Sequence, residues 1–100
     1  MQAMILEKIQ DLSCNRTPLK LAEIPDPVVK ESQVCIKVSV CGVCHTELDE
    51  IEGRTLPPAF PVILGHQVVG VIQEIGPGVT NRKKGDRVGV AWIYSSCGNC

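Results

Sequence analysis

The chain has 100 residues, which is enough for one domain but not for a two-domain enzyme. Its net charge is −1 and its charged residues are dispersed, so the composition offers no basic stripe for nucleic acid and no polybasic anchor for a membrane surface. The first ten residues lack the apolar core of a signal peptide, and no apolar run reaches the roughly 18 residues of a membrane span. A cytoplasmic location is therefore the default expectation.

The elements predicted along the chain are mainly strands. Nine glycines and seven prolines interrupt the sequence, so long helices are not expected. Short apolar-rich runs predict strands at residues 4–9, 19–24, 33–39, 68–75 and 87–93, and one short helix is predicted at residues 45–52. Several short strands joined by turns favour a barrel or a sandwich.

The third of these strands shows a regular alternation of apolar and polar residues. The apolar residues expected on one face are Val34, Ile36, Val38 and Val40. This period is typical of a half-buried strand. Cys41 and Cys44 are then expected just past the end of the strand.

Six cysteines are unusual in a reducing compartment, which disfavours disulfides and leaves metal binding, redox chemistry or burial as explanations. Four of them form two C-x-x-C pairs, Cys41 with Cys44 and Cys97 with Cys100, a spacing that lets two thiolates turn toward one ion. The pairs are separated by 52 residues, against roughly 15–20 in the usual four-cysteine zinc site. Taken alone, each pair fits a metal site, a redox pair or packed thiols.

The residues around these cysteines carry a more specific pattern. The sequence GHQVVG at residues 65–70, followed by GPGV at residues 76–79, resembles the zinc alcohol dehydrogenase signature except at Gln67, where that family usually has Glu. CGVCHTEL at residues 41–48 resembles the family's first zinc-ligand motif, and GDRVG at residues 85–89, followed by a Cys-Gly-x-Cys, resembles the entry to its structural-zinc lobe. The chain is thus similar to the N-terminal part of a zinc-dependent medium-chain alcohol dehydrogenase.

The resemblance implies a fold. It is mainly β, the GroES-like partly open β-barrel with short helices, and residues 1–100 are expected to be a truncated catalytic domain of this kind. The Rossmann nucleotide-binding domain is expected to be absent, because no G-x-G-x-x-G sequence occurs in the chain.

The resemblance also implies a catalytic zinc site. Cys44 and His66 match two of its protein ligands, and Cys41 is left as a strand-end residue. Thr46 matches the hydroxyl that relays the proton of the bound alcohol, with a helix N-cap as the alternative. His45 matches the position that approaches the cofactor pyrophosphate, with an exposed polar residue as an equally weighted alternative.

Further positions carry implied supporting roles. Glu47 resembles the acid that orients a zinc ligand. Gln67 replaces a Glu that places negative charge behind the metal, so slower zinc exchange or hydride transfer is a hypothesis and a tolerated substitution its alternative. Asp49 stands where several relatives carry a His at the end of the proton relay. Cys97 and Cys100 match the first two of four cysteines that hold a structural zinc.

The implied function is oxidation of a small-molecule alcohol to an aldehyde or ketone, or the reverse, with zinc and with NAD or NADP as hydride acceptor. The isolated 100-residue chain is expected to be inactive, and a homo-oligomer is allowed. The alternatives are a zinc-free medium-chain reductase, a non-catalytic GroES-like binding module and, less favoured, a thiol-disulfide protein. The resemblance implies that zinc-free members lack the pair of Cys44 and His66, which argues against the reductase, and zinc content discriminates the dehydrogenase from the binding module.

Overall fold

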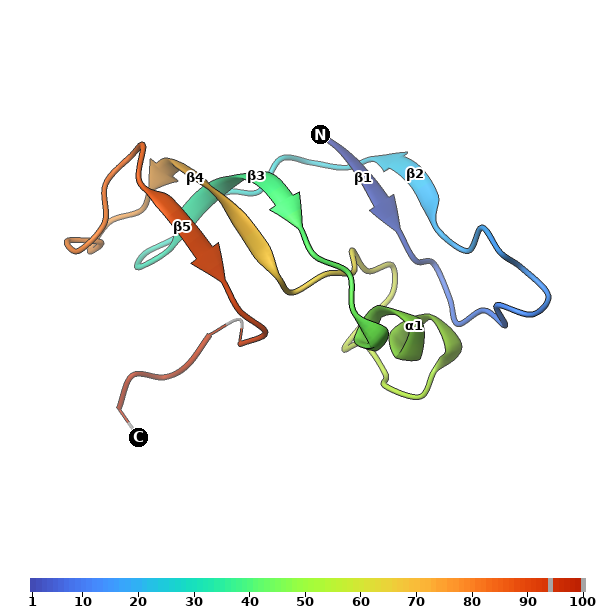
Figure 1. Ribbon diagram of the computed structural model, residues 1–100. Helices are drawn as coiled ribbons and strands as arrows, with labels where there is room; N and C mark the ends of the chain where they lie inside the picture. The colour runs from blue at the N-terminus through green and yellow to red at the C-terminus, as the bar shows by residue number, and fades with distance from the viewer. Residues whose placement is uncertain (94, 100) are drawn as a thin grey trace. The chain divides into compact units, whose positions relative to one another are not determined.

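The structure is a computed structural model that describes residues 1–93 and 95–99. Its elements, in chain order, are β1 (Gln2–Ile5), β2 (Lys20–Glu23), β3 (Val34–Cys41), α1 (His45–Glu52), β4 (Val68–Ile75) and β5 (Arg87–Val90) (Figure 1). The prediction of a mainly β chain with one short helix is confirmed, and α1 and β4 have the predicted bounds. The first and last strands are shorter than predicted, because β1 ends at Ile5 and β5 at Val90. No helix in the described part of the chain has the length and apolar character needed to cross a membrane.

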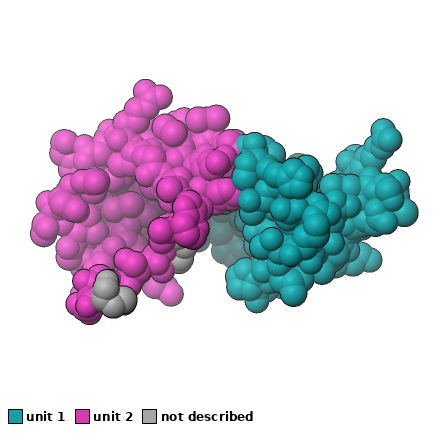
Figure 2. Space-filling model, turned by 60° about the horizontal axis from the view of Figure 1, so that its bottom comes forward, with its two compact units in different colours: residues 1–26, 43–65 teal, residues 27–42, 66–100 magenta. Residues whose placement is uncertain are grey.

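The chain divides into two compact units, coloured separately in Figure 2. Unit 1 consists of Met1–Asp26 and Val43–Gly65, and unit 2 of Pro27–Gly42 and His66–Cys100. Each unit has its own antiparallel sheet, β1-β2 in unit 1 and β3-β4-β5 in unit 2. Neither sheet closes on itself, so the strands leave open edges.

Unit 1 is organised around three buried apolar side chains, those of Ile5, Leu6 and Ile51. Leu6 exchanges two backbone hydrogen bonds with Val62, with N···O distances of 2.8 and 3.0 Å. The backbone N–H of Gln10 donates to the carbonyl of Ile51 at 2.8 Å, which attaches the end of α1 to the segment after β1. The apolar burial and these backbone bonds together fix the helix within unit 1.

Unit 2 is built on β4, the central strand of its sheet. Ile72 on this strand is only 1% exposed and is the main core residue of the unit. Gly70 is required on the same strand, because a Cβ at this position would lie 2.4 Å from the carbonyl oxygen of Lys37 and 2.6 Å from a methyl carbon of Ile36. Glycine therefore allows β3 to approach β4 at this point.

The prediction that four apolar residues of β3 share one face is wrong. Ile36 pairs with Ile72 and Val38 with Gly70, but Val40 pairs with Val69, so Val38 and Val40 fall on opposite faces of the sheet. The register shift between Val38 and Val40 causes this change, because the extra residue in β3, Ser39, reverses the face on which the following side chains lie. Both residues are exposed, Val38 over 54% and Val40 over 58% of their surface. Cys41 is the last residue of β3 rather than a residue beyond it.

Candidate metal centre

The start of α1 is formed by a capping box between Cys44 and Glu47. Cys44 is the N-cap residue, with an extended backbone, and its side chain accepts from the backbone N–H of Glu47. In return, the carboxylate of Glu47 accepts from the backbone N–H of Cys44, with an N···Oε2 distance of 2.7 Å. This is the Ser/Thr-x-x-Glu box with a thiol in place of the hydroxyl. It brings the thiol and the carboxylate to the same end of the helix.

The backbone of unit 2 brings residues 42 and 67 together. Cys41 pairs with Val68 in the sheet, and the N–H of Gly42 donates to the carbonyl of Gln67 at 2.8 Å. Cys44 follows this hydrogen-bonded pair by two residues and His66 precedes it by one. Cys44 and His66 are therefore both within two residues of this backbone hydrogen bond.

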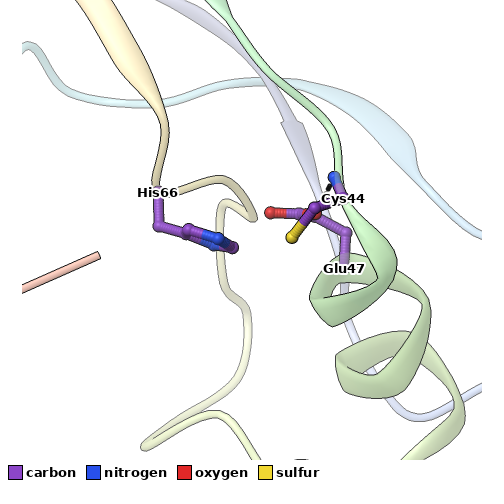
Figure 3. Close-up of side chains that lie close together, drawn as sticks. All are labelled: Cys44, Glu47 and His66. Atoms are coloured by element: carbon purple, nitrogen blue, oxygen red, sulfur yellow. Dashed lines mark hydrogen bonds between the residues drawn. The ribbon is translucent and has the colours of Figure 1, made fainter. Parts of the chain in front are cut away.

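Three side chains offer a group of metal-ligating atoms. One atom each from Cys44, Glu47 and His66 lies within 4.8 Å of the other two, and Figure 3 shows these side chains directed toward one another. Glu47 is buried, with 7% of its surface exposed, and Cys44 and His66 are half-buried. Because these side chains are partly buried, water competes less with a metal ion for their ligand atoms than it does at exposed acidic groups.

The donor chemistry fits zinc. Thiolate sulfur, imidazole nitrogen and carboxylate oxygen are the three donor types that zinc takes from proteins. Bonds of about 2.0–2.3 Å in a tetrahedral arrangement place ligand atoms roughly 3.5 Å apart. The ligand atoms of the three residues lie within 4.8 Å of one another. Three protein donors leave a fourth position for water or a substrate, which is the arrangement of a catalytic rather than a structural zinc site.

The remaining polar residues expected around the site lie on α1. Thr46 is half-buried and is the second helical residue, so the alternative that it is the N-cap is wrong, because Cys44 occupies that position. His45 is exposed over 77% of its side chain, and its Nδ1 lies 3.3 Å from Oδ1 of Asp49.

Asp49 is held by a cation rather than left as a proton acceptor. Its Oδ1 accepts from Nε of Arg54 at 2.6 Å. This hydrogen bond, and the weaker contact with His45, hold the pKa of Asp49 below its ordinary value. A carboxylate kept ionised in this way is a weak base, which disfavours Asp49 as the end of a proton relay.

Gln67 follows His66 in the chain, and its carbonyl accepts from the N–H of Gly42 at 2.8 Å. Its Oε1 would be only 2.9 Å from a Cβ placed on Gly42, so the glycine leaves room for the amide at the start of the connection to Cys44. Gln67 therefore contacts the backbone that leads to the thiol.

The other cysteines do not join this group within the described part of the chain. Cys41, the partner of Cys44 in the first C-x-x-C pair, is exposed, and its Sγ lies 3.6 Å from the carbonyl oxygen of Gly42. Cys97 is exposed, and its sulfur accepts from the backbone N–H of Asn99 at 3.4 Å. Cys100, the other expected structural-zinc ligand, lies outside the described residues.

Sequence reasoning missed two features of the site. It treated Glu47 as an orienting acid, whereas its carboxylate lies among the candidate ligand atoms. The spacing of three residues from Cys44 was the available signal, but cysteine is not among the favoured N-cap residues. The sequence also does not indicate the hydrogen bond between Arg54 and Asp49, because the two residues are five apart and ion pairs on a helix usually join residues three or four apart.

Fold and site together define a small antiparallel β protein with a Cys, Glu and His group at the start of its one described helix. The alcohol dehydrogenase GroES-like domain family matches residues 30–100, and the chain belongs to this family. It is 43% identical to an alcohol dehydrogenase of Geobacillus stearothermophilus over 101 residues, which covers the whole chain but 28% of that protein. The chain thus spans less than a third of this relative.

Solved structures agree with this assignment. The chain aligns over its full length with the crystal structure of AibC, with a TM-score of 0.88 and 31% identity, and covers 26% of that chain. It also aligns over its full length with zinc-dependent alcohol dehydrogenase 2 from Streptococcus pneumonia in its apo form, with a TM-score of 0.81 and 29% identity, covering 27% of that chain. The GroES-like fold expected from the sequence motifs is confirmed.

Proposed function

We propose that the chain is the part of a zinc-dependent alcohol dehydrogenase that carries the catalytic metal site, with Cys44, Glu47 and His66 as the residues that hold the ion. The observation that carries the proposal is the grouping of their ligand atoms within 4.8 Å. The similarity to alcohol dehydrogenases, one of them described as zinc-dependent, supports it. The reaction proposed is oxidation of a small alcohol to an aldehyde or ketone, with hydride transfer to NAD or NADP.

In this proposal each residue of the site has a separate role. The thiolate of Cys44 and the imidazole of His66 bind the ion, and the capping box sets the distance between the thiolate and the Glu47 carboxylate. When bound, zinc supplies Lewis acidity, which lowers the pKa of a bound alcohol toward neutral pH. The substrate loses its hydroxyl proton and a hydride, and the hydride leaves to the nicotinamide.

Thr46 is the proposed first acceptor of the substrate proton. It lies two residues after Cys44 and is half-buried on α1, so its hydroxyl can accept a proton on one side and donate one on the other. Because Asp49 is already paired with Arg54, we propose that the proton leaves Thr46 to water rather than to Asp49. His45, which is exposed, remains a proposed contact of the cofactor pyrophosphate.

Zinc binding by the purified protein tests the proposal. Wild-type protein and the variants Cys44→Ser, His66→Gln and Cys41→Ser are loaded with zinc and titrated with a competing chelator. Cys41→Ser is the matched control, because it removes a thiol of the same C-x-x-C pair that lies outside the donor group. We expect the control to keep wild-type affinity and the other two variants to lose at least about tenfold, the minimum seen when even an outer partner of a zinc ligand is removed.

The same variants distinguish the proposed enzyme from its rivals. The relative from Geobacillus stearothermophilus is more than three times as long as this chain, so activity is measured in the whole protein. There, alcohol-dependent reduction of NAD or NADP is expected to fall in Cys44→Ser as zinc is lost. Undiminished turnover in that variant would favour a zinc-free reductase. Equal zinc loss in Cys41→Ser and Cys44→Ser would contradict the assignment of Cys44.

A further inference from the structure

The connection between β4 and β5 concentrates positive charge. Residues 82–87 contain four cations and one carboxylate, whereas the rest of the chain has six Lys and Arg against ten Asp and Glu. The charges are therefore less evenly dispersed than the net charge of −1 suggests. The segment is too short to follow a nucleic-acid backbone, where binding grows with the number of phosphates neutralised, but it can surround a single anion.

Two arginines of this segment line a pocket in unit 2. The lining residues are Arg82, Asp86, Arg87, Val88 and Gly89, and the pocket has a volume of about 430 Å³. This volume lies within the roughly 300–1,000 Å³ that is typical of small-molecule sites. The site is thus a concavity with cationic walls, suited to a compact ligand.

The one acid in the pocket is already neutralised. Oδ1 of Asp86 accepts from Nζ of Lys83 at 2.6 Å, and Oδ2 accepts from the backbone N–H of the same residue at 3.0 Å. These two hydrogen bonds, helped by the charge of Arg82, hold the pKa of Asp86 below its ordinary value of 3.8. Asp86 is therefore ionised, and the cation that forms an ion pair with it is that of Lys83.

The arginines retain donors for a ligand. Nη1 of Arg82 donates to the carbonyl of Asn81 at 2.8 Å, and the other N–H groups of this guanidinium group can donate to a ligand. In residues 1–93 and 95–99, the guanidinium group of Arg87 has neither a hydrogen bond nor an ion pair. A guanidinium group presents a planar fork of N–H donors that matches the oxygens of a phosphate group.

Backbone hydrogen bonds hold the pocket in shape. The N–H of Ile72 donates to the carbonyl of Asp86 at 2.9 Å, and the N–H of Gly85 donates to the carbonyl of Ile72 at 2.8 Å. The side chain of Ile72 is only 1% exposed, so these bonds tie the basic connection to the core of the sheet. A preformed site loses less conformational entropy when a ligand binds.

We propose that this pocket binds the phosphate group of a small soluble molecule, held by the guanidinium groups of Arg82 and Arg87. Val88 and Gly89 form the uncharged wall against which the rest of the ligand lies. Binding at this pocket does not depend on the proposed zinc site, because it requires residues of the β4-β5 connection and of β5 only.

Titration of the purified full chain with inorganic phosphate tests the proposal, followed by the amide signals in two-dimensional ¹H–¹⁵N NMR spectra at constant ionic strength. We expect saturable shifts confined to residues 82–89. Arg87→Gln keeps a polar side chain but removes the cation, and should weaken binding by about tenfold or more, the usual effect of losing a charge-assisted hydrogen bond. Arg16→Gln removes an exposed cation of unit 1 and is the matched control, with unchanged affinity expected.

Three results would overturn the proposal. They are shifts that rise linearly without saturation, equal weakening in Arg16→Gln and Arg87→Gln, and binding only to vesicles of phosphatidylcholine with phosphatidic acid but not to inorganic phosphate. Arg82→Gln provides a second variant of the pocket should Arg87→Gln fail to fold. Because both side chains are exposed, far-ultraviolet circular dichroism is expected to be unchanged in each.

Discussion

Gly70 provides a sharp test of how the strands of unit 2 pack. In Gly70→Ala, the new methyl group would lie 2.4 Å from the carbonyl oxygen of Lys37, and because real contacts of this type essentially never fall below 3.0 Å, β3 and β4 have to separate by at least 0.6 Å. Overpacking of this kind typically costs about 1–3 kcal/mol. The adjacent strand offers a matched control in Gly89→Ala, whose methyl group would lie 3.8 Å from the nearest atom, the carbonyl oxygen of Val68.

Only the first of the two variants is predicted to lose stability. Gly70→Ala should lower the free energy of unfolding by about 2 kcal/mol, which at a slope of about 1–3 kcal/mol per molar urea lowers the midpoint by roughly 1 M. Gly89→Ala should be neutral or stabilising by up to about 1 kcal/mol, because alanine reduces the entropy of the unfolded chain. Urea unfolding followed by circular dichroism measures both. Equal stability of the two variants would refute the close approach of β3 to β4 at Gly70.

Three further predictions concern the capping box, the glutamine beside the site and the basic connection. Glu47→Ala should destabilise the fold by about 0.5–2 kcal/mol through loss of the hydrogen bond to the N–H of Cys44, whereas Glu47→Gln should keep that bond and most of the stability, as measured by thermal unfolding. Gln67→Glu in the whole protein should raise turnover or zinc retention, and no change in either would remove Gln67 from the mechanism. Asp86 has a lowered pKa in the folded state, so its contribution to stability is present above the ordinary value of 3.8 and is lost as the pH falls through the folded pKa. Asp86→Asn should therefore make the urea midpoint less sensitive to acid, and an unaltered pH profile would contradict the pairing with Lys83.

Elements with strong local end signals were predictable from the sequence. The helix ends at Gly53, which adopts the left-handed conformation with φ of 83°, and β4 ends immediately before the Gly76-Pro77-Gly78 turn. In both cases the residue that stops the element lies next to it in the chain, so local reasoning was sufficient.

The faces of β3 were not predictable in the same way. The alternation of its residues is regular, but the register shifts that reverse its faces depend on the partner strand, where Gly70 offers no side chain opposite Val38. A sequence pattern within one strand contains no information about an irregularity in its pairing.

The candidate metal site was predicted in part because its motifs are short and specific. Cys44 and His66 were chosen by resemblance, while the inclusion of Glu47 depends on the capping geometry at the start of α1. The pocket at Arg87 was missed for a different reason. The cations are visible in the sequence, but only the structure shows that two of them line one pocket and that Asp86 pairs with Lys83.

X-ray absorption at the zinc K edge of the zinc-loaded protein tests the central claim most directly, because it reports the number and type of atoms around the ion. With Cys44, His66 and Glu47 as ligands, the spectrum should show one sulfur at about 2.3 Å and nitrogen or oxygen atoms at about 2.0–2.2 Å, and the sulfur should be lost in Cys44→Ser. A first shell of oxygen alone, or sulfur that persists in Cys44→Ser, would contradict the account.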